Sequence, residues 1–126
     1  FGKALCGVYK KLIHLRRQYP VLRADGFAPD FWEEWQTRLN TEGMGVDCDQ
    51  QMLVYHRYCV DSTGKSQHAV IALNFSPVNR WVDLSFPENG PWRELLNEPE
   101  QTIQVWNHRY SLEVSSHWGK IFFKGE

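Results

Sequence analysis

The hydrophobic and polar positions along this 126-residue chain follow two successive patterns. In residues 3–19 apolar side chains recur at steps of three and four: Leu5, Val8, Tyr9, Leu12, Ile13 and Leu15. This is the helical period, and Pro20 disfavours the α conformation in the residue before it. We therefore expect one amphipathic helix ending at Tyr19. A helix of this length is marginal in water by itself, so its apolar stripe (Leu5, Val8, Leu12 and Ile13) needs a partner surface.

Beyond Asp49 the pattern becomes that of short strands separated by turn residues. The expected strands are residues 51–60, 67–75, 80–86, 92–96, 103–106, 110–114 and 120–123. Residues 69–73 are apolar on both faces, which is typical of a strand covered on both sides. The predicted fold is mainly β: an antiparallel, Greek-key-like β-sandwich preceded by one N-terminal amphipathic α-helix. Residues 21–49 are irregular, and residues 31–35 fit either a short helix or an edge strand.

Composition and charge exclude several classes of partner. The net charge is −1, which favours neither nucleic acid nor an anionic membrane. No apolar run approaches the roughly 20 residues that span a bilayer, so we expect no membrane partner. Cys6, Cys48 and Cys59 form no CxxC pair, and we expect buried or half-buried free thiols in a reducing, cytoplasmic compartment. Because the chain starts at Phe1 within a helical pattern, we expect it to be cut from a larger protein.

The sequence carries no recognisable catalytic motif. The carboxylate pairs Glu33–Glu34, Asp47–Asp49 and Glu98–Glu100 stand in polar loops, where we expect solvated surface and not paired acid–base groups. No two histidines have a metal-ligand spacing, and there is no GxSxG, P-loop or GxGxxG. We therefore predict no catalytic, cofactor-binding or metal-binding residue and no cofactor. His56 and His68 are expected to meet across a hairpin as ordinary polar partners.

Aromatic residues are the feature that suggests binding. They make up 14% of the chain and include six tryptophans. In a small sandwich most tryptophans fill the core, and we expect this of Trp81, Trp92, Trp106 and Trp118. Trp32 and Trp35 lie in an irregular acidic segment, so they are the candidates for stacking on carbohydrate.

Several segments, in this order, carry a more specific signal. Residues 12–22 (LIHLRRQYPVL) resemble the last barrel helix of α-amylase superfamily enzymes. Residues 52–57 (MLVYHR) and 70–76 (VIALNFS) are similar to the first hairpin of that superfamily's C-terminal β domain. Residues 92–97 (WRELLN) resemble its next landmark strand, and residues 118–123 (WGKIFF) stand where its final strand lies. Residues 25–49 depart from the common pattern.

The resemblance implies a division of the chain and a role. Residues 1–22 would be the last helix of a truncated (β/α)8 barrel, and residues 23–126 the C-terminal β-sandwich domain. In the family the catalytic carboxylates lie on barrel loops upstream of this helix, so none is carried over. The expected function is a non-catalytic, stabilising domain of an enzyme that hydrolyses or transfers glycosidic bonds of α-glucans.

The expected partners are the catalytic barrel of the same enzyme and, weakly, α-glucan. Without the barrel, the apolar stripe would dock on the β domain, self-associate with a second copy, or stay exposed. Two alternatives remain: a free-standing carbohydrate-binding module and a protein-interaction β-sandwich. A module would not begin within a barrel-like helix.

Overall fold

The computed structural model describes residues 2–23, 26–28, 44–60, 63–97 and 101–125, with backbone only for residues 2–6, 27 and 28. Within these residues one helix and one 3-10 turn precede nine strands. The elements are α1 (Gly2–Gln18), η1 (Pro20–Arg23), β1 (Gly26–Ala28), β2 (Gly45–Asp47), β3 (Met52–Val60), β4 (Ser66–Asn74), β5 (Arg80–Ser85), β6 (Gly90–Glu94), β7 (Gln101–Val105), β8 (Arg109–Val114) and β9 (Trp118–Lys124).

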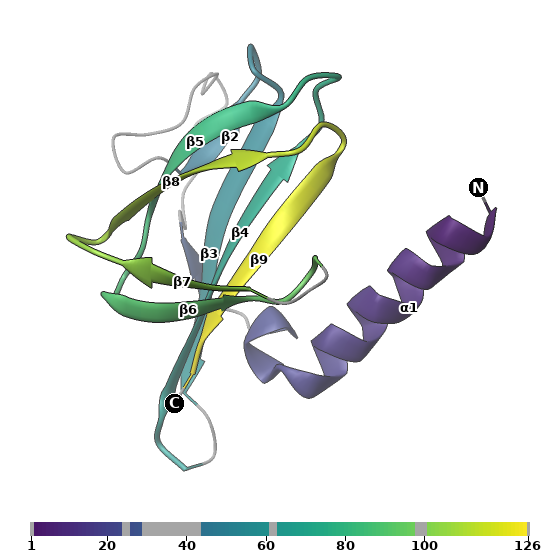
Figure 1. Ribbon diagram of the computed structural model, residues 1–126. Helices are drawn as coiled ribbons and strands as arrows, with labels where there is room; N and C mark the ends of the chain where they lie inside the picture. The colour runs from purple at the N-terminus through teal and green to yellow at the C-terminus, as the bar shows by residue number, and fades with distance from the viewer. Residues whose placement is uncertain (1, 24–25, 29–43, 61–62, 98–100, 126) are drawn as a thin grey trace.

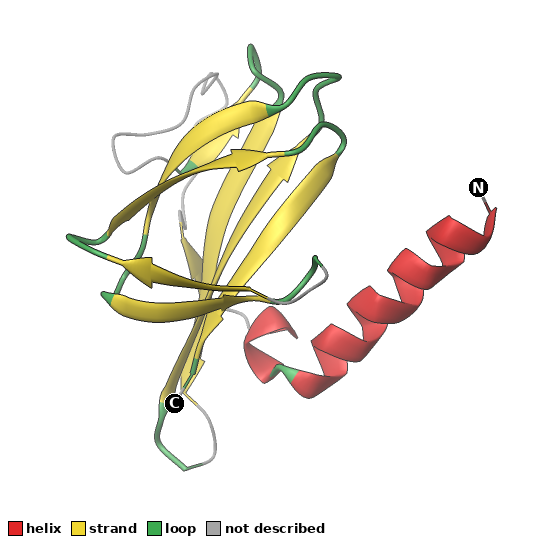
Figure 2. Ribbon diagram, viewed as in Figure 1, coloured by secondary structure: helices red, strands yellow, loops and turns green. Residues whose placement is uncertain are grey.

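The strands form two antiparallel sheets (Figure 1). The large sheet has the order β1-β3-β4-β9-β6-β7, with β2 also paired to β3, and the small sheet is the ribbon β5-β8. The ribbon covers one face of the large sheet, and η1 with the end of α1 lies against the other (Figure 2). This arrangement confirms the predicted antiparallel β-sandwich with one N-terminal helix.

Strand β4 explains why the sheet has a core on each side. It lies between β3 and β9. Val70 and Ala72 point into the core beneath the ribbon, whereas Ala69 and Ile71 point into the core beneath η1 and α1. Successive side chains of a strand point to opposite faces, so a strand that is covered on both faces needs apolar residues at every position. Residues 69–73 meet this requirement.

The predicted helix and the seven predicted strands are confirmed, with ends displaced by a few residues. Residues 21–49, expected to be irregular, also contribute most of η1 and the three-residue strands β1 and β2. These two strands pair with successive parts of β3, β2 with residues 52–54 and β1 with residues 56–58. Such short strands depend on an existing strand edge, so the local pattern does not reveal them. Residues 31–35 lie outside the described part of the chain.

The expected core position of the tryptophans is right for one residue and wrong for three. Trp92 is fully buried, whereas Trp81 is 70% exposed, Trp106 83% and Trp118 38%. Trp81 alternates with the buried Val82 and so shares the outward face of β5 with Asp83. Trp106 precedes a hairpin turn whose central residues, Asn107 and His108, have positive φ. Strand alternation therefore outweighs the hydrophobicity of the indole at Trp81.

The described cysteines form no disulfide. Cys59 is half-buried on β3, as expected for a buried or half-buried thiol, and its Sγ lies 3.8 Å from Oε1 of Gln67. Cys48 is exposed in the turn after β2, so the expected burial is wrong there. A turn at the end of a three-residue strand has no covering layer that would bury a thiol. The side chain of Cys6 lies outside the described residues.

Candidate functional site

An open apolar groove of about 490 Å³ lies between α1 and the outer face of the large sheet. Most of its lining side chains are aliphatic or aromatic: Val8, Leu12, Leu15, Leu22, Tyr55, Ile71, Leu73, Phe75, Leu96, Trp118 and Ile121. Arg16 and Arg57 add positive charge at its rim. A concave apolar surface of this size is typical of a site that receives a ligand or another protein segment.

The C-terminal end of α1 holds the helix on the sheet. Tyr19 is buried, and its ring packs on Phe123 of β9 with 4.6 Å between ring centroids. The guanidinium of Arg93 lies 5.7 Å from the centroid of the Tyr19 ring and donates a hydrogen bond to its hydroxyl. Val21 of η1 is fully buried in the same cluster. The Tyr-Pro-Val sequence that ends the helix is therefore also its attachment point.

Arg23 closes the helix end. Its Nη1 donates to the carbonyl oxygens of Arg16 at 2.7 Å and Arg17 at 3.2 Å. These carbonyls belong to the last turn, which has no further helical N–H groups to accept from. A cationic side chain at this position also complements the negative end of the helix dipole.

The rest of the predicted apolar stripe remains largely uncovered. Leu15 is 6% exposed, but Leu12 is 37% exposed and Ile13 53%. Val8 is half-buried, and the side chain of Leu5 lies outside the described residues. Figure 1 shows α1 diverging from the sheet toward its N-terminus. The groove lies between the helix and the sheet. The helix thus docks on the β domain through Leu15, which follows the stripe, while the described residues of the stripe stay half-buried or exposed.

A buried carboxylate positions the groove wall at Trp118. Oε2 of Glu94 accepts hydrogen bonds from the backbone N–H groups of Leu96 at 2.8 Å and Ile121 at 3.0 Å. Its Oε1 accepts from the backbone N–H of Asn97 at 2.9 Å and from Nδ2 of Asn97 at 2.6 Å. Oδ1 of Asn97 in turn accepts a hydrogen bond from the indole N–H of Trp118. Because both carboxylate oxygens accept hydrogen bonds, Glu94 ties β6 to β9.

Glu94 is the important residue that the search for carboxylate pairs misses. It has no second carboxylate beside it, and the signal that contains it is the 92–97 motif (WRELLN). In the structure this motif supplies three linked elements: the buried Trp92, the clamp Glu94 and the partner Asn97. Gly119 lies beside the clamp, where a Cβ would stand 2.6 Å from Cδ2 of Leu73. Only glycine permits β9 to approach β4 so closely there.

The predicted contact between His56 and His68 is confirmed. Their Nε2 and Nδ1 atoms lie 3.1 Å apart, although the two residues are diagonal neighbours in the β3–β4 register. Nε2 of His68 lies 3.1 Å from a carboxylate oxygen of Glu88. Burial, and then the nearby His68, lowers the pKa of His56 from 6.5 to about 4. A buried histidine held neutral in this way is a polar core partner.

The remaining candidate residues do not form a reactive site in the described part of the chain. Trp32 and Trp35, the predicted stacking residues, lie outside it, as do the pairs Glu33–Glu34 and Glu98–Glu100. Asp49 is exposed, and Oδ1 of Asp47 accepts from the backbone N–H of Gln50 at 2.9 Å, as in an ordinary turn. Within the described residues, no cluster of three or more histidine, cysteine or acidic side chains is arranged to hold a metal ion. The one described helix is too short and too polar to span a bilayer.

Comparison with known proteins yields a likeness of fold. No protein-family model matches the sequence, and no curated protein matches it significantly. Among solved structures, an Anoxybacillus α-amylase, described as giving insight into a new glycosyl hydrolase subclass, superimposes with a TM-score of 0.62 at 20% identity. The match covers 96% of this chain and 22% of that chain, so this chain spans about a fifth of the amylase. The fold, helix included, is therefore one that also occurs as part of an α-amylase.

Proposed function

We propose that this chain is the non-catalytic C-terminal β domain of an α-amylase-like enzyme that acts on α-glucans. Residues 1–22 would complete the enzyme's (β/α)8 barrel as its last helix, and residues 23–126 would form the appended β-sandwich. The groove between α1 and the large sheet would then receive neighbouring barrel elements. Hydrolysis or transfer of glycosidic bonds belongs, in this proposal, to the barrel.

The attachment of α1 carries the proposal. The helix is fixed through the buried Tyr19 and Val21, yet Tyr9, Leu12 and Ile13 are 59%, 37% and 53% exposed. A helix that rests on its own domain only at one end still has apolar surface to bury. The last helix of a barrel has such a double requirement, because it packs on the barrel and leads directly into the next domain.

Two further observations support the proposal. The fold matches part of an α-amylase over 96% of this chain, which includes the helix as well as the sandwich. The motifs that resemble the superfamily also fall on structurally decisive positions, since residues 12–22 form the attachment and residues 92–97 form the clamp. A free-standing module would gain nothing from an unburied helix face.

The proposed role is mechanical. Contact between the barrel's outer surface and the groove with the exposed helix face would remove apolar surface from water. Each Å² of apolar surface buried in this way stabilises the contact by roughly 25 cal/mol. The domain would thereby resist detachment of the last barrel helix, because that helix is covalently continuous with the sandwich and packs on it through Tyr19 and Val21. Contact with α-glucan would be weak and secondary.

Two measurements on the pure isolated chain test the proposal. We expect no release of reducing sugar from starch or maltooligosaccharides at any protein concentration; release proportional to the amount of chain added would refute the non-catalytic role. Titration with maltoheptaose should reveal at most weak binding. A tight response, with a Kd near about 1 μM, would instead favour the free-standing carbohydrate-binding module.

The module alternative has one observation in its favour. Trp81 and Trp106 are 70% and 83% exposed, and an exposed indole offers an apolar face and an N–H group to a ligand. Neither residue lines the groove. Their exposure is compatible with both readings, since a domain attached to a barrel can still present a free face.

A further inference from the structure

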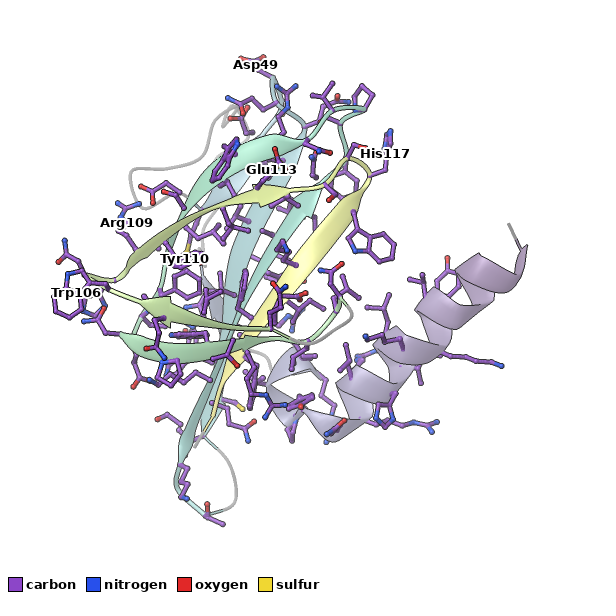
Figure 3. All side chains as sticks on the ribbon, viewed as in Figure 1. Asp49, Trp106, Arg109, Tyr110, Glu113 and His117 are labelled. Carbon is purple, nitrogen blue, oxygen red and sulfur yellow. The ribbon has the colours of Figure 1, made fainter. Side chains whose placement is uncertain are left out.

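A second concavity, of about 280 Å³, opens beside β8 where the ribbon meets the large sheet. Seven of the residues that line it carry polar groups: Trp81, Glu94, Gln101, Tyr110, Ser111, Glu113 and Lys120. The carboxylate of Glu94 is already engaged in the clamp described above. Trp81 and Glu113 are directly paired across β5 and β8. Tyr110 and Glu113 lie along the same strand: Tyr110 directly follows Arg109 at the hairpin end of β8, and Glu113 lies farther along it (Figure 3). We call this concavity the Trp81 cleft.

Several polar groups of the Trp81 cleft have no partner within the described part of the chain. The indole N–H of Trp81, the carboxylate of Glu113 and the ammonium group of Lys120 make no hydrogen bond or ion pair there. By contrast, the indole N–H groups of Trp92 and Trp118 are both bonded, to the carbonyl of Glu88 and to Asn97. A free donor, a free acceptor and an exposed aromatic face therefore border the same cleft.

We infer that the Trp81 cleft binds a neutral oligosaccharide. A sugar ring offers an apolar C–H face that stacks on an indole and a rim of hydroxyls that both donate and accept. Glu113 and Lys120 have opposite charges, so the free side chains of the cleft do not select a charged ligand. The volume lies just below the range of about 300–1,000 Å³ for small-molecule pockets, which fits a chain lying across the opening better than an enclosed ligand.

The Trp81 cleft and the apolar groove lie on opposite sides of the large sheet. Phe122 lines the cleft and Ile121 lines the groove, and successive side chains of β9 point to opposite faces. Occupation of the groove by a barrel would consequently leave the cleft open to solvent. The choice of an α-glucan as the ligand to test rests on the proposed function, whereas the cleft itself does not.

The test is an NMR titration of the isolated ¹⁵N-labelled chain with maltoheptaose. The indole N–H resonance of Trp81 is assigned by its loss in Trp81→Phe. We expect this resonance to shift progressively and saturably, with a Kd weaker than about 0.1 mM because one stacked ring in an open cleft provides little binding energy. Trp81→Ala should weaken binding about tenfold.

Trp106→Ala is the matched control, because it removes a second exposed indole (83%, against 70% for Trp81) that does not line the cleft. It should leave the affinity unchanged. The inference is overturned if the chemical shift of the Trp81 indole N–H changes with neither maltoheptaose nor cellohexaose. It is also overturned if the Trp81→Ala variant binds as tightly as the parent chain. Either result leaves the docking role of the groove intact. An equal response to cellohexaose supports the cleft and removes its link to α-glucans.

Discussion

The ring of Tyr19, the last residue before Pro20, packs on Phe123 of the final strand with 4.6 Å between centroids. The two residues are far apart in sequence, yet their contact determines where the helix leaves the sandwich. Arg93 reinforces it from β6, with its guanidinium 5.7 Å from the Tyr19 ring centroid and 5.9 Å from that of Phe123. The helix, β6 and β9 thus meet at one aromatic contact.

Truncation of Tyr19 should detach the helix from the sheet. Tyr19→Ala removes a buried aromatic ring, and we expect it to lower the free energy of unfolding by about 3–5 kcal/mol. Tyr19→Phe keeps the ring and loses only the hydroxyl that accepts from Arg93, so about 1 kcal/mol is expected. Urea unfolding followed by tryptophan fluorescence measures both. Tyr9→Ala, on the same helix but 59% exposed, serves as the control and should change stability by less than about 0.5 kcal/mol.

Glu94 should be intolerant of even an isosteric change. Glu94→Gln replaces a carboxylate oxygen with an NH₂ group that faces backbone N–H donors of Leu96 and Ile121 or of Asn97. Left without acceptors, these buried groups cost about 2–4 kcal/mol in unfolding free energy, measurable by urea titration. The exposed Glu113→Gln is the comparison and should be nearly neutral. If the two variants proved equally stable, Glu94 would not be a clamp.

The fold follows from the sequence to the extent that its elements are self-sufficient. The period of residues 3–19 and the alternation after Asp49 reflect burial of one face, so they predict α1 and strands β3 to β9. The short strands β1 and β2 exist because β3 offers its edge to both. No local pattern encodes that dependence, and so the sequence predicts only an irregular segment there.

The groove beside α1 and the Trp81 cleft are harder to predict from the sequence than the fold. The apolar stripe predicts that α1 needs a partner surface, but not that Leu15 and Tyr19 find it while Ile13 does not. Trp81 could have been placed outside by its alternation with Val82 and Leu84. Its convergence with Lys120 of β9 depends on how the ribbon lies over the large sheet, which is a tertiary property. Trp32 and Trp35 stay a prediction.

The stability of the chain should fall as the pH falls from about 6.5 to about 4. The pKa of His56 is lowered to about 4 in the folded chain, so between these values the unfolded chain binds more protons. The effect is about 2 kcal/mol after allowance for partial solvent screening. Urea midpoints measured across this range should show a smaller loss in His56→Leu than in the parent chain.

His68 lies against His56 and Glu88 lies against His68, with 3.1 Å from Nε2 of His56 to Nδ1 of His68 and 3.1 Å from Nε2 of His68 to a carboxylate oxygen of Glu88. Burial and His68 are the causes of the lowered pKa of His56. Nε2 of His68 faces the Glu88 carboxylate, and its Nδ1 faces Nε2 of His56. The exposed His14→Gln is the control for the general effect of losing a histidine. A pH profile that stays the same in His56→Leu would show that other groups govern the acid sensitivity.

The uncovered helix face should make the isolated chain self-associate. Tyr9 and Ile13 are 59% and 53% exposed, and pairing of two such faces is the simplest way to bury them. Because a stable dimer needs about 1,200 Å² or more of buried surface, one helix face should give only a weak dimer. Sedimentation velocity from about 10 μM to 1 mM should therefore show a concentration-dependent shift toward dimer. Ile13→Lys should abolish that shift, and Lys10→Gln, on the exposed polar side, should preserve it. A parent chain that stays monomeric throughout would mean that the face tolerates exposure and does not pair.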